Sequence, residues 1–368
     1  MTRLIAPELL YRNGDLVGGQ VVEVTDGTVT AVRPRRSDDA RPDAEPYLLL
    51  PALTDLQVNG GGGVMLNSEP TPEGMAAIIA AHRGLGTGWI LPTVITDAPE
   101  VLARTVDAAL EMKGTPGFLG LHIEGPHIAP ARRGTHKEAF IRPLDDTTVR
   151  HCERLRAAGI PVMLTLAPER TAPETITRLA DLGVIVSAGH TEADAPTTEA
   201  ALAAGLSAFT HLFNAMPPMT SRAPGIVAAA IRSRSHVGLI ADGIHVDWRI
   251  AQIACAARPE KNLTFLVSDA MATVGGPDHF TIYGQDIFVR DGALVNAEGS
   301  LAGAHIDMVT SLANAHHRIG LPLAEAIAMA TDIPRAAMQL EPVGIAAGLP
   351  EDSMIALGPD LSLITCQL

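Results

Sequence analysis

A chain of 368 residues with 47% hydrophobic content can build a large core and a small accessory domain. Its net charge of -14 and isoelectric point near 5.3 argue against nucleic acid as a partner, because phosphate backbones require clustered Lys and Arg. No stretch approaches the roughly 20 apolar residues of a membrane span, and the N-terminus lacks an apolar signal region. Three scattered cysteines, Cys152, Cys255 and Cys366, indicate free thiols, so we expect a cytoplasmic protein.

The first segment alternates apolar and polar residues around the Asp26-Gly27 turn, which is typical of a β-hairpin. Short β-like runs then alternate with Ala-rich helical stretches, as in a parallel α/β sheet. Eight strands are expected to begin near Leu48, Gly88, Phe118, Pro161, Val184, Ala208, Val237 and Leu263. Eight such units predict an α/β fold of the (β/α)8, or TIM-type, barrel class.

After the eighth strand the sequence predicts an inserted β-hairpin over residues 280–297. Helical periodicity follows up to about Leu340, and residues 353–366 again resemble a strand. We therefore predict two domains, the second of them a small β-sandwich built from both chain ends: a catalytic barrel over 49–340, and the sandwich over 1–48 and 341–368.

Four of the apolar runs end in a candidate metal ligand or acid: Glu124, His190, His211 and Asp269. A parallel barrel gathers the carboxyl ends of its strands at one face, so these residues can meet around one ion. Glu124, His190 and His211 would hold a divalent metal with one position open for water, as in catalytic zinc sites. Asp269 follows a fully apolar strand, where an unpaired charge would be costly, so we expect it to accept the proton of that water.

Seven motifs follow one another along essentially the whole chain: Asp55-Leu56-Gln57-Val58-Asn59-Gly60, His122-Ile123-Glu124-Gly125-Pro126, Gly134-Thr135-His136, Ala188-Gly189-His190-Thr191, Thr210-His211-Leu212-Phe213-Asn214-Ala215-Met216, Ala241-Asp242-Gly243-Ile244-His245 and Val267-Ser268-Asp269-Ala270. Together they resemble the N-acetylglucosamine-6-phosphate deacetylases of the amidohydrolase superfamily. The resemblance implies hydrolysis of the acetamide of N-acetyl-D-glucosamine 6-phosphate to D-glucosamine 6-phosphate and acetate. Such a reaction belongs to amino-sugar catabolism and cell-wall sugar recycling.

The same resemblance implies further roles. His136 would donate to the carbonyl oxygen of the amide, and Asp269 would return its proton to the sugar nitrogen. The phosphate would be bound by Arg222, His245 and the backbone of Asn214 and Ala215. In this family the arginine can come from a neighbouring subunit, so a homodimer is implied. For His136 and Arg222 the alternative is an ordinary loop residue.

Many amidohydrolases carry a His-x-His pair after the first strand and hold two metals, whereas this chain has Gln57 and Asn59 there. Neutral amide oxygens are poor zinc ligands, so we predict one divalent ion, first Zn2+, with Fe2+, Co2+ or Mn2+ as alternatives. Gln57 is assigned to substrate binding; the alternative is that both amides cap the strand. His127 departs from the family pattern and would place an extra imidazole near the metal or the sugar.

Three other functions stay open: deacetylation of N-acetylgalactosamine 6-phosphate, hydrolysis of another amide by the same chemistry, and a non-catalytic scaffold. Arg222 and His245 favour a phosphorylated substrate. A scaffold would be expected to have lost metal ligands or the acid, and the chain retains all of them. Asp242 and Asp247 are interpreted as capping or loop residues.

Overall fold

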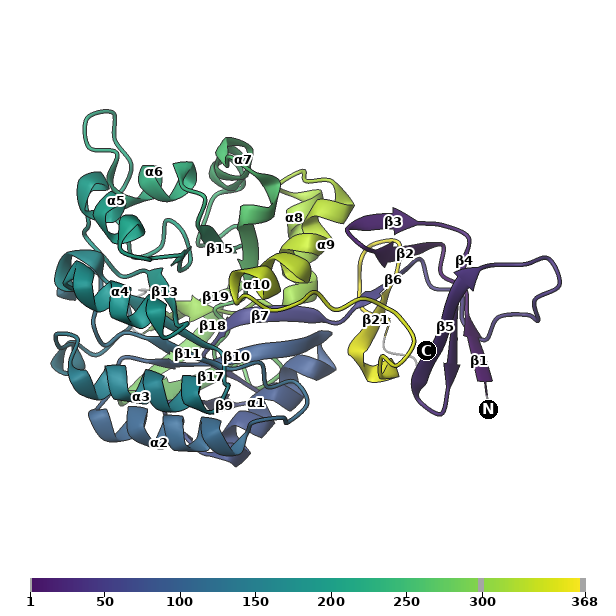
Figure 1. Cartoon of the computed structure of the whole chain (residues 1–368), viewed down its shortest axis with the longest axis horizontal. Helices are drawn as coiled ribbons and strands as arrows, with labels where there is room; N and C mark the ends of the chain where they lie inside the picture. The colour runs from purple at the N-terminus through teal and green to yellow at the C-terminus, as the bar shows by residue number, and fades with distance from the viewer. Residues whose placement is uncertain (1, 297–300, 365–368) are drawn as a thin grey trace.

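The computed structural model describes residues 2–296 and 301–364. An eight-stranded parallel sheet wrapped by helices forms the larger part, and both chain ends meet in a smaller β-structure beside it (Figure 1). No helix among the described residues is long and apolar enough to cross a membrane. Cys152 and Cys255 are both free thiols.

The strands of the large sheet, in spatial order, are β7 (Leu53–Val58), β10 (Thr87–Ile95), β11 (Leu121–Glu124), β12 (Val162–Leu166), β13 (Ile185–Ala188), β14 (Ala208–Phe209), β15 (His236–Ile240) and β16 (Thr264–Val267). Val58 forms a parallel bridge with Ala270, which brings the first strand beside the last and nearly closes the barrel. Most of these strands are buried along their whole length, which explains their continuous apolar runs. The prediction of a (β/α)8 barrel is confirmed.

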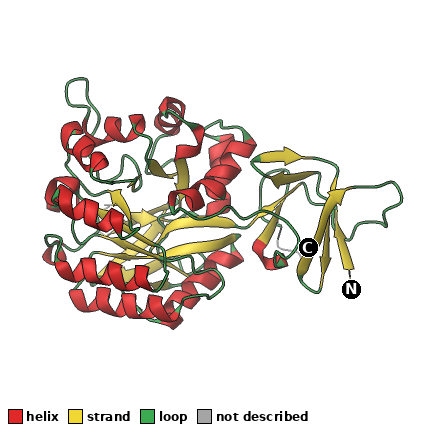
Figure 2. Cartoon of the chain, in the orientation of Figure 1, coloured by secondary structure: helices red, strands yellow, loops and turns green. Residues whose placement is uncertain are grey.

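Ten α-helices among the described residues form the outer layer, drawn in red in Figure 2. They are α1 (Pro72–Gly84), α2 (Pro99–Glu111), α3 (Asp146–Ala157), α4 (Pro173–Asp181), α5 (Ala195–Ala203), α6 (Gly225–Arg232), α7 (Trp248–Ala257), α8 (Met308–His317), α9 (Leu323–Ala330) and α10 (Asp332–Ala337). Several begin at a side-chain cap: Thr71 accepts from Gly74 before α1, and Asp145 accepts from Thr148 before α3.

The accessory β-sandwich pairs two sheets, drawn in purple and yellow at the right of Figure 1. The sheets contain β1 (Thr2–Ile5), β4 (Gln20–Thr25) and β5 (Thr28–Pro34), and β21 (Met354–Leu357), β6 (Leu48–Pro51), β2 (Leu9–Arg12) and β3 (Asp15–Val17). Their shared core holds Ile5, Val22, Leu49 and Ala356, from both ends of the chain. The hairpin expected at Asp26-Gly27 is confirmed by the antiparallel pairing of β4 and β5.

Two strand predictions need correction near the chain ends. The strand expected from Leu48 is two strands in different sheets, because β6 pairs with β2 and β21 while the barrel begins at Leu53. An unbroken buried run from residue 48 to 58 gives no sequence signal for that break. The final strand is also shorter than expected, since only β21 forms within the predicted residues 353–364, and residues 365 and 366 lie outside the described residues.

The segment after the barrel is larger than the hairpin expected over 280–297. It is an antiparallel sheet of four strands, β17 (His279–Ile282), β18 (Gln285–Arg290), β19 (Ala293–Asn296) and β20 (Leu301–Ala304), and residue 297 lies outside the described residues. The prediction missed a second turn at Tyr283-Gly284, where both residues have positive φ. This sheet packs on Met65, Ile95 and Met271 at the mouth of the barrel.

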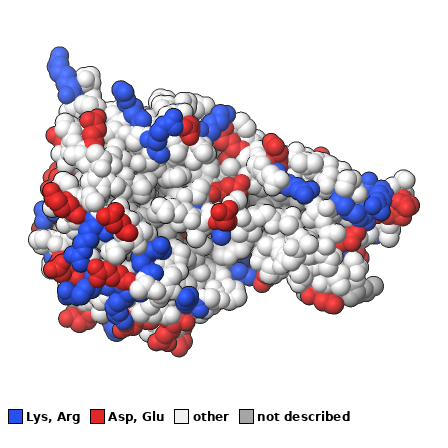
Figure 3. Space-filling view, in the orientation of Figure 1, with Lys and Arg blue, Asp and Glu red and all other residues white. Residues whose placement is uncertain are grey.

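A last small hairpin, β8 (Gly60–Gly61) and β9 (Val64–Met65), follows the first barrel strand. The glycines here allow close packing of backbones: a Cβ on Gly60 would lie 2.4 Å from the carbonyl oxygen of Val64 and 2.8 Å from the nitrogen of Ala272. On the face shown in Figure 3, basic and acidic side chains are interspersed along the helices.

Candidate active site

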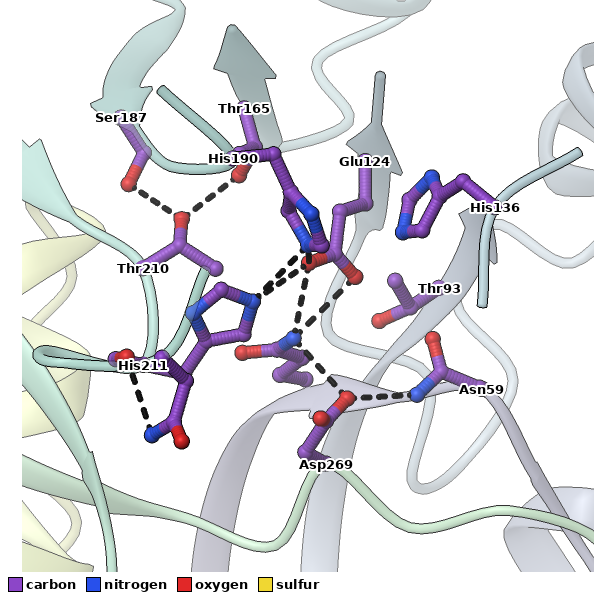
Figure 4. A network of polar contacts seen from close by, with 12 residues as sticks. Asn59, Thr93, Glu124, His136, Thr165, Ser187, His190, Thr210, His211 and Asp269 are labelled. Carbon is purple, nitrogen blue, oxygen red and sulfur yellow. Dashed lines mark hydrogen bonds and ion pairs between the residues drawn. The ribbon is translucent and has the colours of Figure 1, made fainter. Parts of the chain in front are cut away.

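The predicted metal ligands and Asp269 all leave the barrel at the carboxyl ends of strands. Glu124 is the last residue of β11, while His190, His211 and Asp269 each lie two residues beyond β13, β14 and β16. The last three have φ angles of 50°, 32° and 51°, in the left-handed region that residues other than glycine seldom occupy. All four are buried, and they meet at one point of the rim (Figure 4).

The three predicted ligands form a compact cluster. The Nε2 atoms of His190 and His211 each lie 3.1 Å from Oε1 of Glu124 and 3.0 Å from each other. The Nδ1 of His190 is 2.8 Å from the carbonyl oxygen of Arg132, so Nδ1 carries a hydrogen and Nε2 is the ring nitrogen that would bind a metal. Two imidazole nitrogens and a carboxylate facing one point are the protein donors of a catalytic zinc site. The residues fit a divalent metal ion.

Hydrogen bonds between Glu124 and the two histidines stabilise charged side chains in this buried cluster. Burial opposes ionisation of Glu124, but the hydrogen bonds from His190 and His211 hold its pKa well below the usual range. Burial likewise opposes a charge on His211, yet Glu124 raises the pKa of that imidazole. The protein without metal therefore favours a proton on His211, which a metal ion must displace, so metal binding should release a proton.

Two amides at the end of the first barrel strand hold Asp269, the predicted general base. Asn59 Nδ2 donates to Oδ1 of Asp269 at 2.7 Å, and Gln57 Nε2 donates to the same oxygen at 2.9 Å. Gln57 Nε2 also lies 3.1 Å from both carboxylate oxygens of Glu124. Burial, and next the charge of Glu124, raise the pKa of Asp269 to about 6, near the pH at which a base must work.

His136 stands across the site, its ring centroid 4.3 Å from that of His190. Its Nδ1 accepts from the backbone N–H of Thr96 at 3.3 Å and lies 2.7 Å from the hydroxyl of that residue. A backbone N–H can only donate, so Nδ1 is unprotonated and Nε2 carries the hydrogen. Burial holds the pKa of His136 well below its ordinary value. His136 is therefore a neutral hydrogen-bond donor.

A cavity of about 320 Å³ opens over these groups. Its walls include eight of the ten predicted site residues and several that sequence analysis missed. The predicted ones on its wall are Glu124, His136, His190, His211, Asn214, Ala215, His245 and Asp269, the missed ones Asn59, Arg132, Thr135, Met271, Leu301 and Gly303. Asn59 could have been found from its place in the motif after the first strand. Leu301 and Gly303 carry no local signal, because β20 reaches the site only through tertiary packing.

Two predicted substrate contacts do not line this cavity. Gln57 is 2% exposed, and its side-chain nitrogen donates to the two carboxylates, so it supports Glu124 and Asp269 instead of facing a ligand. Arg222 is exposed on the loop 217–224, outside the cavity wall, and no hydrogen bond or ion pair of its side chain occurs among the described residues. The cavity of one chain therefore lacks the predicted arginine.

His245 lines the cavity, as predicted, and its Nδ1 lies 2.6 Å from Oδ2 of Asp242. Although burial opposes it, this hydrogen bond lowers the pKa of Asp242, and the backbone N–H groups of Ile244 and His245 donate to its other oxygen. Asp242 thus organises its own loop, as interpreted from the sequence. Asp247 likewise caps α7 by accepting from the N–H of Arg249.

His127 does not approach the metal cluster or the cavity. Its Nδ1 lies 3.1 Å from the carbonyl oxygen of Arg142 and its Nε2 lies 3.0 Å from the hydroxyl of Thr148. The prediction of an extra imidazole at the site was wrong, because both ring nitrogens are bonded away from it, to the loop carbonyl of Arg142 and to Thr148 of α3.

Comparisons with known proteins show the family of the chain. The model of the amidohydrolase family matches residues 48–354. The N-acetylgalactosamine-6-phosphate deacetylase of Shewanella sp. (strain ANA-3) is 39% identical over 92% of this chain and 88% of its own, and the N-acetylglucosamine-6-phosphate deacetylase of Haemophilus influenzae is 32% identical over 81% and 79%.

Solved structures show the same likeness. The N-acetylglucosamine-6-phosphate deacetylase of Pasteurella multocida superposes with a TM-score of 0.90 at 29% identity, covering 99% of this chain and 97% of that one. An aspartate-to-alanine mutant of the enzyme from Mycobacterium smegmatis, in complex with N-acetyl-D-glucosamine 6-phosphate, superposes at 0.86 with 30% identity, covering 98% and 96%. The chain belongs to the amidohydrolase family, among relatives that deacetylate N-acetylated amino-sugar 6-phosphates.

Proposed function

We propose that this chain hydrolyses the acetamide of N-acetyl-D-glucosamine 6-phosphate to D-glucosamine 6-phosphate and acetate. The observation that carries the proposal is the convergence of Glu124, His190 and His211 with Asp269 on one cavity. A base beside a metal-ligand cluster is the arrangement that hydrolysis of a stable amide requires. The relatives of this chain, named for such deacetylations, support the same substrate class.

The residues of the chain divide the chemistry between them. When bound by Glu124, His190 and His211, a divalent ion supplies Lewis acidity, which brings the pKa of coordinated water to about 7 and polarises an amide carbonyl. Asp269 takes the proton of the attacking water and returns it to the departing sugar nitrogen, acting as base and then as acid. The Nε2–H of His136 donates to the acetyl oxygen as negative charge develops there.

We propose zinc as the metal, with Fe2+, Co2+ and Mn2+ as the alternatives. Two imidazoles and one carboxylate form a mixed nitrogen and oxygen donor set. Zinc binds well to such a set, whereas magnesium and calcium prefer ligands that are all oxygen. One ion per chain is expected, because the amide nitrogen of Gln57 faces Glu124 and Asp269, and a protonated nitrogen cannot serve as a ligand.

The phosphate group would lie at the other end of the cavity, beside His245 and the backbone of Asn214 and Ala215. We propose that Arg222 completes this pocket from the neighbouring subunit of a homodimer. Its exposed loop lies outside the cavity of its own chain, and Met219 on that loop is 54% exposed. Ile253 on α7 is 59% exposed, and such apolar side chains are suited to a subunit contact. The cytoplasmic location expected from the cysteines stays a prediction.

N-acetylgalactosamine 6-phosphate is the second candidate substrate. The relative from Shewanella, 39% identical to this chain, is named for that sugar, whereas the N-acetylglucosamine-6-phosphate deacetylase of Haemophilus influenzae is 32% identical. The two sugars share the acetamide and the phosphate and differ only at the fourth carbon of the ring, so the chemistry described above serves both. The ratio of kcat/KM for the two sugars decides between them.

The test is acetate release by chelated and by zinc-reconstituted protein, with both phosphorylated sugars and unphosphorylated N-acetylglucosamine. We expect release that depends on metal and is much weaker without the phosphate. Faster release from the galactosamine epimer would assign the second substrate. No release from either phosphorylated sugar with any divalent metal would refute the proposal.

A further inference from the structure

Asn59 occupies a fixed place between the first and last barrel strands. It follows β7 directly, its N–H donates to the carbonyl oxygen of Ala270 at 2.8 Å, and its own carbonyl oxygen accepts from Leu66 at 3.0 Å. The residue is 1% exposed and yet forms part of the cavity wall. Both backbone groups are thus held, so the side chain has a defined position at the site.

The orientation of the Asn59 amide follows from its neighbour. Nδ2 donates to Oδ1 of Asp269 at 2.7 Å, and the opposite orientation would place a carbonyl oxygen against a carboxylate. The side-chain oxygen of Asn59 must then point away from Asp269, as Figure 4 shows. That oxygen is buried and has no hydrogen-bond partner among the described residues. A buried acceptor left unpaired is costly, so its retention at a reaction site needs a reason.

The bonding of Asp269 indicates which group can satisfy this acceptor. Oδ1 of Asp269 already receives two N–H groups, from Gln57 and Asn59. Its other oxygen is therefore the one that exchanges protons, and the nitrogen that receives the proton must lie beside it. Before hydrolysis that nitrogen carries one hydrogen, a donor that also needs a partner once the sugar is bound. The free oxygen belongs to Asn59, which is bonded to Asp269 and lines the same cavity.

We infer that the side-chain oxygen of Asn59 accepts the N–H of the scissile amide and thereby orients the sugar nitrogen toward Asp269. This inference rests on the proposed function and adds a residue that binds the N–H group of the scissile amide. It explains why an asparagine stands here: one side chain anchors the base through its nitrogen and the substrate through its oxygen. An ester in place of the amide lacks this hydrogen and loses the contact.

The alternative is that Asn59 acts only through Asp269. Gln57 provides the matched control, because it donates to the same carboxylate oxygen but does not line the cavity. Replacing Gln57 by Met removes an N–H donor of Asp269 and leaves the proposed substrate contact in place. Replacing Asn59 by Leu, of similar shape, removes both.

The experiment compares kcat/KM for the amide, N-acetylglucosamine 6-phosphate, with that for the ester analogue, 2-O-acetylglucose 6-phosphate. Wild type, Asn59→Leu and Gln57→Met are measured at saturating zinc, with metal content and melting temperature as checks on folding. We expect Gln57→Met to slow both substrates by the same factor. Asn59→Leu should slow the amide about tenfold more than the ester, the effect of one lost buried hydrogen bond. Dissociation constants of both compounds for the metal-free proteins should show the same selective loss.

The outcomes separate the two proposals. If wild type hydrolyses the amide and Asn59→Leu slows amide and ester equally, the inference about Asn59 is overturned while the proposed function stands. If Asn59→Leu does not fold, Asn59→Ser, which keeps a short polar side chain without reach, gives the same comparison. If wild type hydrolyses neither phosphorylated amide, the proposed function fails and this inference fails with it.

Discussion

The two ends of the cavity are built in different ways. At the metal end Glu124, His190, His211 and Asp269 are each at most 9% exposed and are linked to one another or to the amides of the first strand. At the end proposed for the phosphate, the His245 side chain is hydrogen-bonded to Asp242 alone within the described part of the chain, and Arg222 lies on an exposed loop away from the wall. The groups proposed for the chemistry are thus arranged within one chain, whereas the proposed recognition of the phosphate would depend on an arginine from the neighbouring subunit.

Removing the base at the metal end should have the largest effect. Asp269→Asn keeps the shape but cannot accept a proton, so we expect kcat to fall about a thousandfold or more, with the zinc content unchanged. Phosphorylated and unphosphorylated sugars should lose the same factor, because the defect lies in the chemical step. Steady-state kinetics and metal analysis on one preparation check this, and a variant with more than a tenth of wild-type kcat would contradict the role.

Removing the cation at the phosphate end should act on binding instead. Arg222→Ala should raise KM for the phosphorylated sugar about tenfold to a hundredfold and leave kcat nearly unchanged, since a charge-assisted hydrogen bond contributes about 1.5–3 kcal/mol. The unphosphorylated sugar should not respond. Mixed dimers of Arg222→Ala and Asp269→Asn chains sharpen the comparison: one fully competent site per dimer is expected only if the arginine crosses between subunits. Activity of a strictly monomeric wild type with unchanged KM would contradict the shared site.

The pH profile tests how strongly the metal end is organised. Ionised Asp269 is the form that accepts a proton, and burial raises its pKa to about 6. A bound cation favours the ionised form, so the loaded enzyme should lose activity only below about pH 6. We expect kcat/KM to fall about tenfold per pH unit under that limit and to be level above it. An acid limb above pH 7 in the zinc form would argue against Asp269 as the base.

A smaller effect is expected at the support of His136. Thr96→Val removes the hydroxyl 2.7 Å from Nδ1 but keeps the backbone N–H, so the ring stays neutral and loses part of its orientation. We expect kcat to fall severalfold, in line with about 1 kcal/mol for one hydrogen bond, with KM unchanged. The deeper loss expected for His136→Ala serves as the reference, and equal losses in the two variants would show that the hydroxyl does more than orient the ring.

His127 belongs to neither end and should affect activity least. His127→Phe breaks the contacts to Arg142 and Thr148, so the free energy of unfolding should fall by about 1–3 kcal/mol. Activity at 25 °C should stay within a factor of two. A changed metal content would instead place His127 at the site, against the geometry described here.

Much of the metal end could be predicted from the sequence because its residues follow apolar strands directly. Glu124, His190, His211 and Asp269 sit where strand runs stop, and a parallel barrel fixes where such ends meet. The role of Gln57 could not be predicted, because the sequence does not show whether its amide oxygen or nitrogen faces the carboxylates. In the structure the amide nitrogen of Gln57 donates to both carboxylates, so Gln57 holds Glu124 and Asp269 in position.

The remaining differences come from tertiary packing. Leu48 and Leu53 lie in different sheets, because their strands pair with different partners. Both are buried leucines in one apolar run, so the sequence does not distinguish them. Leu301 and Gly303 reach the cavity through the four-stranded insertion, which carries no motif of its own. The direction of His127 depends on Arg142 and Thr148, which are far enough along the chain to leave no local pattern.

The positive φ angles of His190, His211 and Asp269 lower the stability of the fold at positions that the proposed activity requires. Each such residue costs about 1–2 kcal/mol relative to glycine, which adopts positive φ freely. A redesign that optimised the fold alone would therefore favour glycine at three positions without which no hydrolysis is expected. Gains in thermal tolerance for this protein should be sought in the helices and the accessory sandwich, where no such conflict exists.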